Sequence, residues 1–297
     1  MKLPAEWLKE YCDINITNEQ IVTQLTMAGI ECELLDVPGE IIDISLTPNR
    51  ADCFSVLGVS RELAALNNMN FKSDQNTQTT IDHNDEIEIK IESPKDCPVL
   101  MVRIINDIDI NATTPAVITK RLNSSGIQSV NIIVDITNYV MLETGQPLHA
   151  YDLRAIDSEL IVRRGHNKEN ITLLDGSIKT VDQNYLLISD VEKVLGIAGI
   201  MGGKNSGIQI DTKNIVLESA YFNNETIMGK PRILNLHTES GLRFERGVDP
   251  SIQNHAIERA SKLINENSGG KNGPITNSTS SSETPKRLPI LLRKKRI

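Results

Sequence analysis

The sequence predicts an α+β protein with a small N-terminal α/β unit and a larger mixed α+β domain. Helix and strand patterns alternate up to about residue 70, whereas strand patterns with few helices follow from about residue 82. The polar segment 71–84 offers little to bury and is typical of a linker. We therefore expect domains at 1–70 and 85–275, joined by this linker and followed by a flexible basic tail at 276–297.

Composition limits the classes of function. The 297 residues carry a formal net charge of −8, and an acidic chain is a poor non-specific binder of polyanions, so any RNA contact must be local and DNA is not an expected partner. The four cysteines form no Cys-x-x-Cys pair, which favours free thiols over a zinc ribbon or a disulfide framework. No run of eighteen apolar residues occurs, so we expect a cytoplasmic protein without a membrane partner.

The N-terminal unit is predicted from two helices and two strands. Thr17 and Gln20 have the spacing of a capping box, and Gly29 suits the left-handed end of the same helix. Strands are expected at 31–37 and 41–46, on either side of a Pro-Gly turn. A second helix then has its apolar residues at helical spacing: Val56, Val59, Leu63 and Leu66.

The second domain is predicted mainly as strands. Thr114 should cap a helix with Pro115 at its first position and Gly126 beyond its end. A second amphipathic helix is expected at 250–267, and the segment 278–282 is expected to be flexible. Strands are expected at 87–91, 99–105, 160–163, 171–174, 185–189, 194–197 and 214–218, with a hairpin turn at Asp175-Gly176.

Candidate site residues lie in four places. His149 follows a Gly-Pro break at the end of the segment 134–152, where a side chain can point into a cleft. The glycine-rich run 196–203 matches no nucleotide fingerprint, and a tight turn or a binding wall explains it equally well. Glu218 ends an apolar strand, where a salt bridge is the commoner explanation. The fourth place is the polar segment 238–240.

Three segments together resemble the β subunit of bacterial phenylalanyl-tRNA synthetase: 134–152, Thr47-Pro48-Asn49-Arg50-Ala51-Asp52-Cys53 and Arg243-Phe244-Glu245-Arg246-Gly247-Val248-Asp249-Pro250. The resemblance runs from Met1 to about Pro285. It implies an N-terminal unit that lacks the family's inserted oligonucleotide-barrel domain, a B3/B4-like editing domain, and a family continuation beyond this chain.

The resemblance also implies roles for particular residues. The family's proofreading pocket hydrolyses tyrosine wrongly esterified to the phenylalanine tRNA. Glu218 matches the residue that reads the tyrosine hydroxyl, and catalytic positions around the ester and the attacking water match His149, Asn138 and Thr238. Gly199 and Gly202 match the pocket lining. The family usually has arginine at Gln128, alanine at Ser240 and more arginine in 230–236, so the hold on the tRNA end is expected to be weaker.

The same resemblance leaves several functions open. Editing needs no cofactor, while ATP and magnesium belong to synthesis in an assembly with the α subunit, and this chain alone is not expected to aminoacylate tRNA. The acceptor end of the phenylalanine tRNA is an expected partner, and the α subunit is a further candidate. The alternatives are a non-catalytic module that binds an aromatic amino acid or a protein, and an inactive fragment. A zinc site from His149, His237 and Glu218 is a weak hypothesis, because no pair has ligand spacing.

Overall fold

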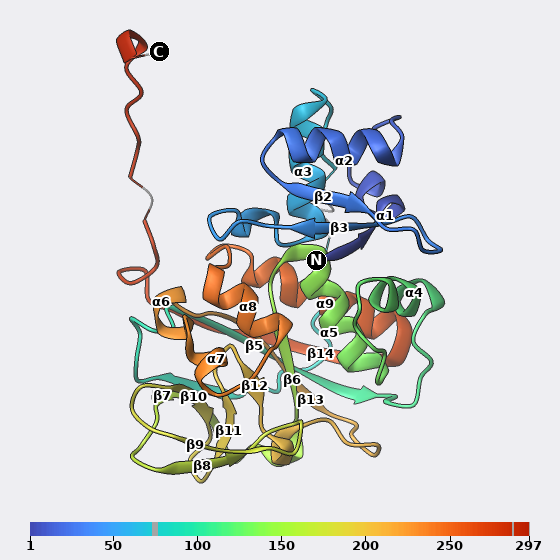
Figure 1. The fold of residues 1–297 in the computed structure, drawn as a ribbon. Coiled ribbons are helices and arrows are strands. Elements are labelled where there is room, and N and C mark those ends of the chain that lie inside the picture. The colour runs from blue at the N-terminus through green and yellow to red at the C-terminus, as the bar shows by residue number, and fades with distance from the viewer. Residues whose placement is uncertain (73–76, 287, 297) are drawn as a thin grey trace.

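The computed structural model describes residues 1–72, 77–286 and 288–296, and four sheets organise them (Figure 1). A three-stranded sheet belongs to the N-terminal unit, and a four-stranded, a five-stranded and a two-stranded sheet follow. The predicted α+β class is confirmed.

The N-terminal unit is an antiparallel sheet, with strand order β1-β3-β2, covered by helices. The capping box is present: Thr17 Oγ1 accepts from the Gln20 amide, and the Thr17 amide donates to Gln20 Oε1 at 2.9 Å. Gly29 adopts the left-handed φ of +88° that ends the same helix. The elements are β1 Lys2–Pro4, α1 Ala5–Glu10, α2 Asn18–Met27, β2 Glu31–Leu34, β3 Ile41–Ser45 and α3 Val56–Leu66.

The four-stranded sheet is the central layer of the second part, with antiparallel order β14-β5-β13-β6. Side chains alternate along β13, so Ile215 and Leu217 join the core under the helices, whereas Val216 and Ala220 join the core on the opposite face. The strands are β5 Val99–Ile108, β6 Leu148–Asp152, β13 Ile215–Tyr221 and β14 Gly269–Thr279. Helices α5 Ile132–Thr144 and α9 Gln253–Ser268 cover one face of the sheet, and α4 Ala116–Ser124 packs against α5.

The five-stranded sheet has the order β12-β11-β10-β7-β4 and packs against the other face of the central layer. Only the pair β4–β7 is parallel. Its strands are β4 Glu88–Ile91, β7 Glu159–Arg164, β10 Leu186–Ser189, β11 Val194–Ile197 and β12 Met201–Gly202. The predicted hairpin is the two-stranded sheet β8 Glu169–Thr172 and β9 Ile178–Val181, and the remaining helices are α6 Asn224–Ile227, α7 Lys230–Ile233 and α8 Glu239–Arg246.

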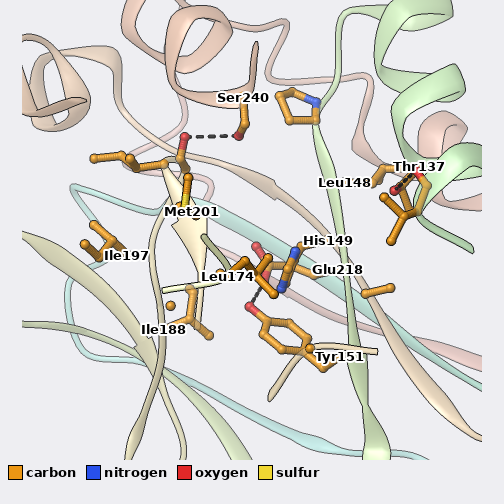
Figure 2. A pocket seen from close by; sticks show the side chains of 18 of the residues that line it. Thr137, Leu148, His149, Tyr151, Leu174, Ile188, Ile197, Met201, Glu218 and Ser240 are labelled. Atoms are coloured by element: carbon orange, nitrogen blue, oxygen red, sulfur yellow. Dashed lines mark hydrogen bonds between the residues drawn. The ribbon is translucent and has the colours of Figure 1, made fainter. Parts of the chain in front are cut away.

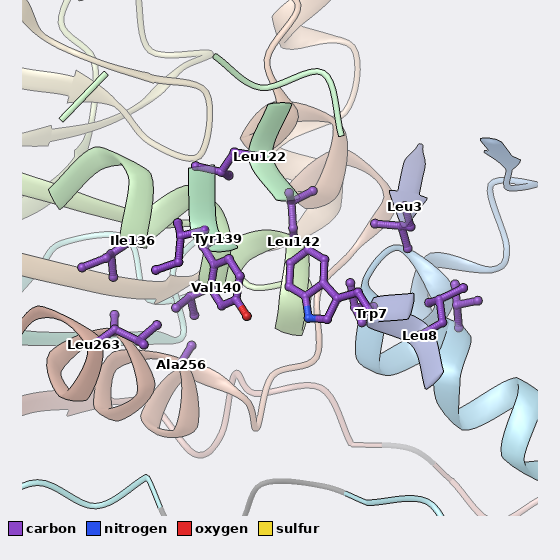
Figure 3. Close-up of a cluster of buried hydrophobic side chains, with 14 of the residues drawn as sticks. Leu3, Trp7, Leu8, Leu122, Ile136, Tyr139, Val140, Leu142, Ala256 and Leu263 are labelled. Atoms are coloured by element: carbon purple, nitrogen blue, oxygen red, sulfur yellow. The ribbon is translucent and has the colours of Figure 1, made fainter. Parts of the chain in front are cut away.

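The N-terminal unit shares its core with the second part. Trp7 is fully buried and stacks on Tyr139 of α5, with ring centroids 4.8 Å apart (Figure 3). The Arg121 guanidinium of α4 lies 4.7 Å from the centre of the indole ring. One cluster of buried apolar residues runs from Leu3 through α5 to Leu263 of α9. The N-terminal unit and the second part, which meet near residue 70, therefore share one continuous hydrophobic core.

Helix α5 was not predicted from the sequence. It is capped by Asn131, whose side chain accepts from the amides of Ile133 and Val134, and it ends at Gly145 with φ +84°. Apolar residues surround it because the N-terminal unit, α9 and the central sheet bury it on several sides. A helix buried all round has no single apolar stripe, so its sequence shows no helical periodicity.

Three other expectations were wrong. Thr114 does not cap α4: Pro115 is the capping residue, and the Thr114 hydroxyl donates to the buried Asp135 carboxylate at 2.6 Å. The polar linker contributes to the fold after its first residues, because Thr77 is buried and Thr79 donates to Glu258 through its amide and its hydroxyl. The part of that prediction that falls on residues 73–76 lies outside the described residues.

The third correction concerns the segment after α9. Instead of turning flexible near residue 278, the chain forms strand β14, which pairs with β5 as far as Thr279. Its glycines, asparagines and proline disfavour strands, and the register shifts between Asn272 and Ile275, where Pro274 is accommodated. Beyond β14 the chain leaves the body with Leu288, Ile290, Leu291 and Leu292 exposed (Figure 1). Within the described residues, no helix has the length and apolar character needed to cross a bilayer.

The shared core gives a stability prediction. Trp7→Ala removes a fully buried indole and its contacts with Tyr139 and Arg121, so we expect a loss of about 3–5 kcal/mol in the free energy of unfolding. Urea denaturation followed by circular dichroism measures this loss. Met27→Ala is the control, because Met27 is 83% exposed and its truncation should change stability by less than about 0.5 kcal/mol. Similar small losses for both variants would contradict a core shared through Trp7.

Candidate functional site

Strand register brings His149 and Glu218 together. The antiparallel pairing of β6 with β13 makes these two residues direct Cα partners. Directly opposite residues point to the same face of a sheet, here the face turned toward the five-stranded sheet. Figure 2 shows the imidazole and the carboxylate side by side. The sequence-predicted pair therefore lies in one site, although His149 is on a strand and not in the loop after the Gly-Pro break.

Tyr151 completes a polar cluster with these two residues. It lies two positions after His149, so both side chains are on the same face of β6. Its hydroxyl donates to Glu218 Oε2 at 2.5 Å (Figure 2). Its ring meets the imidazole edge-on, with centroids 4.4 Å apart. Tyr151 was not predicted as a site residue. Its spacing of two from His149 indicates a common face only once both residues are known to lie on a strand.

A cavity of about 490 Å³ opens beside this cluster. This volume is within the range of small-molecule sites. Its walls come from β6 and β13, from β10 to β12, and from the beginnings of α5 and α8. Glu218 is the only charged residue among the described residues that line it. Most other lining side chains are apolar, including Leu174, Phe222 and Phe244.

Burial sets the charge state of the cluster. Removal from water raises the pKa of Glu218 to about 7, while the hydrogen bond from Tyr151 acts in the opposite direction. Burial also lowers the pKa of His149 to about 4, so the imidazole is neutral at pH 7. Its Nε2 atom is buried without a hydrogen-bond partner, and no described residue forms a salt bridge with Glu218. The structural explanation of Glu218 as half of an ion pair is therefore excluded for the described residues.

The glycine-rich run is both a turn and a wall. It joins β11 to β12 and forms one side of the cavity. A Cβ at Gly202 would lie 2.5 Å from two atoms of the His149 imidazole, so only glycine fits beside this ring. Gly199 has a φ of +69°, and a Cβ there would meet Phe222 at 3.0 Å. These two glycines allow the backbone to approach the ring and the apolar side chains closely.

The remaining predicted residues divide into two groups. Asn138 of α5 and Ser240 of α8 line the cavity. The Ser240 hydroxyl donates its hydrogen to the Gly199 carbonyl at 3.0 Å, so toward a ligand it can act only as an acceptor. Thr238 and Gln128 are not among the lining residues. Gln128 is exposed, and Thr238 caps α8 by accepting from the Gly241 amide while donating to the Ile200 carbonyl.

The structure gives no support to the zinc hypothesis. His237 is exposed, and it does not line the cavity that contains His149 and Glu218. Within the part of the chain that the structure describes, the one group with metal-ligand geometry is Asp52, Cys53 and Glu62. The Arg50 guanidinium bonds to all three of these side chains, so a protein cation already satisfies them.

Most of the layered α+β fold, with the His-Glu-Tyr cluster, lies in a segment that matches one family of domains. The B3/4 domain model matches residues 96–269, and the chain belongs to this family. That range contains all of the described residues that line the cavity.

The chain is also similar to curated phenylalanine–tRNA ligase β subunits. It is 41% identical over 265 residues to the subunit from Yersinia pestis and 43% identical over 263 residues to that from Hahella chejuensis, in each case covering 89% of this chain and 33% of the relative. The chain thus spans about a third of these relatives' length. A solved N-terminal fragment of the Pyrococcus horikoshii β subunit is 14% identical, with a TM-score of 0.42 over 94% of this chain and 79% of the fragment.

The raised pKa of Glu218 predicts that this residue stabilises the fold less at neutral pH than in acid. A carboxyl group whose pKa rises from 4.5 to about 7 on folding stabilises the fold while protonated, and this contribution is lost as the pH rises from about 4.5 to 7. Glu218→Gln cannot ionise. We therefore expect its stability relative to wild type to increase through this range and to level off above it, as measured by urea denaturation at several pH values.

The titration of His149 must be separated from that of Glu218, and an exposed glutamate provides the control. The lowered pKa of His149 makes wild-type stability rise with pH between about 4 and 6.5, but this contribution is common to wild type and Glu218→Gln and cancels in their difference. Glu225→Gln alters an exposed carboxylate and should show a flat difference. A flat difference for Glu218→Gln as well would contradict a buried carboxyl group at this position.

Proposed function

We propose that the cavity is a hydrolytic proofreading site that releases tyrosine from tRNA wrongly charged in place of phenylalanine. The observation that carries this proposal is the buried Glu218 carboxylate in an otherwise uncharged cavity. Tyrosine differs from phenylalanine only by a phenol hydroxyl, and a buried acceptor is the group that detects such a hydroxyl. Membership of the B3/4 family and similarity to the ligase β subunits support the choice of an aminoacyl-tRNA substrate.

The preference for tyrosine follows from the difference in binding free energy between tyrosine and phenylalanine at Glu218. The Tyr151 hydroxyl donates to Glu218 Oε2, and no described residue donates to Glu218 Oε1. A bound tyrosine can donate its phenol to Oε1, whereas a bound phenylalanine would remove water from that oxygen without replacing the hydrogen bond. Polar readout of this kind separates substrates by much larger factors than one apolar contact can. Tyrosine is therefore the preferred substrate, and the correct phenylalanyl product is spared.

Hydrolysis is assigned to a positioned water and not to a covalent intermediate. His149 is neutral at pH 7 and its imidazole lines the cavity, where it can orient a water molecule. A base with a pKa near 4 removes protons weakly at pH 7, so its contribution is mainly orientation. Asn138 lines the same cavity and supplies an amide, and the terminal hydroxyl of the tRNA assists. We propose no cofactor for this reaction.

Synthesis of aminoacyl-tRNA is proposed to require more than this chain. The chain spans about a third of the curated relatives' length, and each relative is a β subunit by name. We propose that aminoacylation with ATP and magnesium needs an α subunit, and that this chain contributes proofreading and contacts with the acceptor end of the tRNA.

A second candidate is a module that binds an aromatic amino acid without turning over an ester. The observation that favours it is Thr238, whose hydroxyl is engaged by the Gly241 amide and the Ile200 carbonyl and does not line the cavity. Calorimetry with tyrosine and with phenylalanine tests this candidate. Tyrosine binding together with an absence of ester hydrolysis would favour it over proofreading.

The main test compares wild type and Glu218→Ala on two substrates, tyrosyl-tRNA and phenylalanyl-tRNA, both made with the phenylalanine tRNA. We expect the ratio of kcat/KM for the tyrosyl over the phenylalanyl ester to fall by about 10- to 100-fold, the value of one hydrogen bond to a charged group. The assay measures release of radiolabelled amino acid. Glu225→Ala is the matched control, because it removes an exposed carboxylate outside the cavity and should keep the wild-type ratio.

Two outcomes would overturn the proposal. Release of tyrosine by the wild type no faster than in buffer would eliminate hydrolysis. A tyrosine preference that survives Glu218→Ala unchanged would eliminate the role of this carboxylate in reading the phenol.

A further inference from the structure

A tyrosine of the protein itself, Tyr151, already donates a hydrogen bond to Glu218, the carboxylate that is proposed to recognise the phenol of a substrate. Tyr151 is almost fully buried, and its hydroxyl donates to Glu218 Oε2 at 2.5 Å (Figure 2). The Tyr151 ring is fixed edge-on against His149 and belongs to the core between the two large sheets. This donor is therefore held by packing and is present before any ligand arrives.

We propose that Tyr151 is a positioning and specificity-determining residue of the cavity: it holds Glu218 by Oε2 and leaves Oε1 as the carboxylate oxygen that accepts from a substrate phenol. This inference rests on the proposed proofreading function and names the residue that sets its selectivity. Glutamate has three rotatable bonds, and the short hydrogen bond restricts the carboxylate to an orientation in which its other oxygen can accept.

The groups around Glu218 make this hydrogen bond important for its charge. His149 and Tyr151 face it from β6, and the buried thiol of Cys97 faces it from the turn before β5. None of these groups is a cation at neutral pH, and the lining residues from β10 to β12 and from α5 and α8 carry no charge. The Tyr151 hydroxyl is thus the protein donor that lowers the pKa of Glu218 against the effect of burial.

Selectivity should consequently depend on pH. The ionised carboxylate accepts a charge-assisted hydrogen bond from a phenol, which is stronger than a bond to the protonated acid. Preference for the tyrosyl ester should therefore rise as the pH passes through about 7, where Glu218 ionises. Tyr151→Phe removes the donor and keeps the ring. Without the donor, ionisation and the rise in preference should both move to higher pH, by about one to two pH units.

The experiment measures hydrolysis of tyrosyl and phenylalanyl esters of the phenylalanine tRNA between pH 5.5 and 9, for wild type, Tyr151→Phe and Tyr221→Phe. The ratio of the two kcat/KM values removes pH effects common to both esters. Tyr221→Phe is the matched control: Tyr221 lies on β13, the strand that carries Glu218, but it does not line the cavity and faces away from Glu218. We expect the midpoint of the ratio to shift only in Tyr151→Phe. An equal loss of activity on both esters without such a shift would reduce Tyr151 to a packing residue.

A second measurement needs no substrate. Carbon-13 NMR of glutamate carboxyl groups, with the Glu218 signal assigned by its absence in Glu218→Gln, reports the ionisation of Glu218 directly. Its midpoint should rise by the same one to two pH units in Tyr151→Phe and stay unchanged in Tyr221→Phe. If the wild type hydrolyses neither ester, proofreading fails while this titration still decides the role of Tyr151. An unchanged titration in Tyr151→Phe overturns the positioning proposal, whatever the hydrolysis assay shows.

Discussion

The pairing of β6 with β13 is the constraint on which the site depends. In this register His149 faces Glu218, and Tyr151, which pairs with Val216 two positions along, lies on the same side. Because side chains alternate along a strand, a shift of one residue would turn Glu218 toward the helices, where Ile215 and Leu217 are buried now. Pairing of β13 with β5 on its other edge fixes this register from a second side.

Layering explains how a carboxylate is tolerated at this depth. The central sheet has helices on one face and a second sheet on the other, so neither face of β13 is open to solvent along its length. A charge in such a place must find a partner or give up its ionisation. Glu218 has one hydrogen-bond partner, the phenol of Tyr151, and its pKa of about 7 means that it is only partly ionised at neutral pH. Its charge is therefore the most adjustable property of the cavity.

The sequence predicted the elements that have a local signal. The capping box at Thr17, the hairpin at Gly176 and the strands with alternating apolar residues follow from propensity and spacing. Helix α5 and strand β14 do not: the first is apolar on all sides, and the second is an unfavourable sequence stabilised by pairing with β5. Likewise, Glu218 and His149 were selected as separate residues, whereas Tyr151 and the structural use of Thr238 depend on contacts between distant segments.

The core that continues from Leu3 to Leu263 limits how this molecule could be divided. Helix α5 contacts Trp7 through Tyr139, and it also carries Asn138 into the cavity wall. A graft of the pocket onto another scaffold would therefore have to include the first 66 residues or a substitute surface for α5. In the same way, recombination between related chains at the apparent boundary near residue 70 would join two halves of one interior, and only partners with matching shapes there would fold.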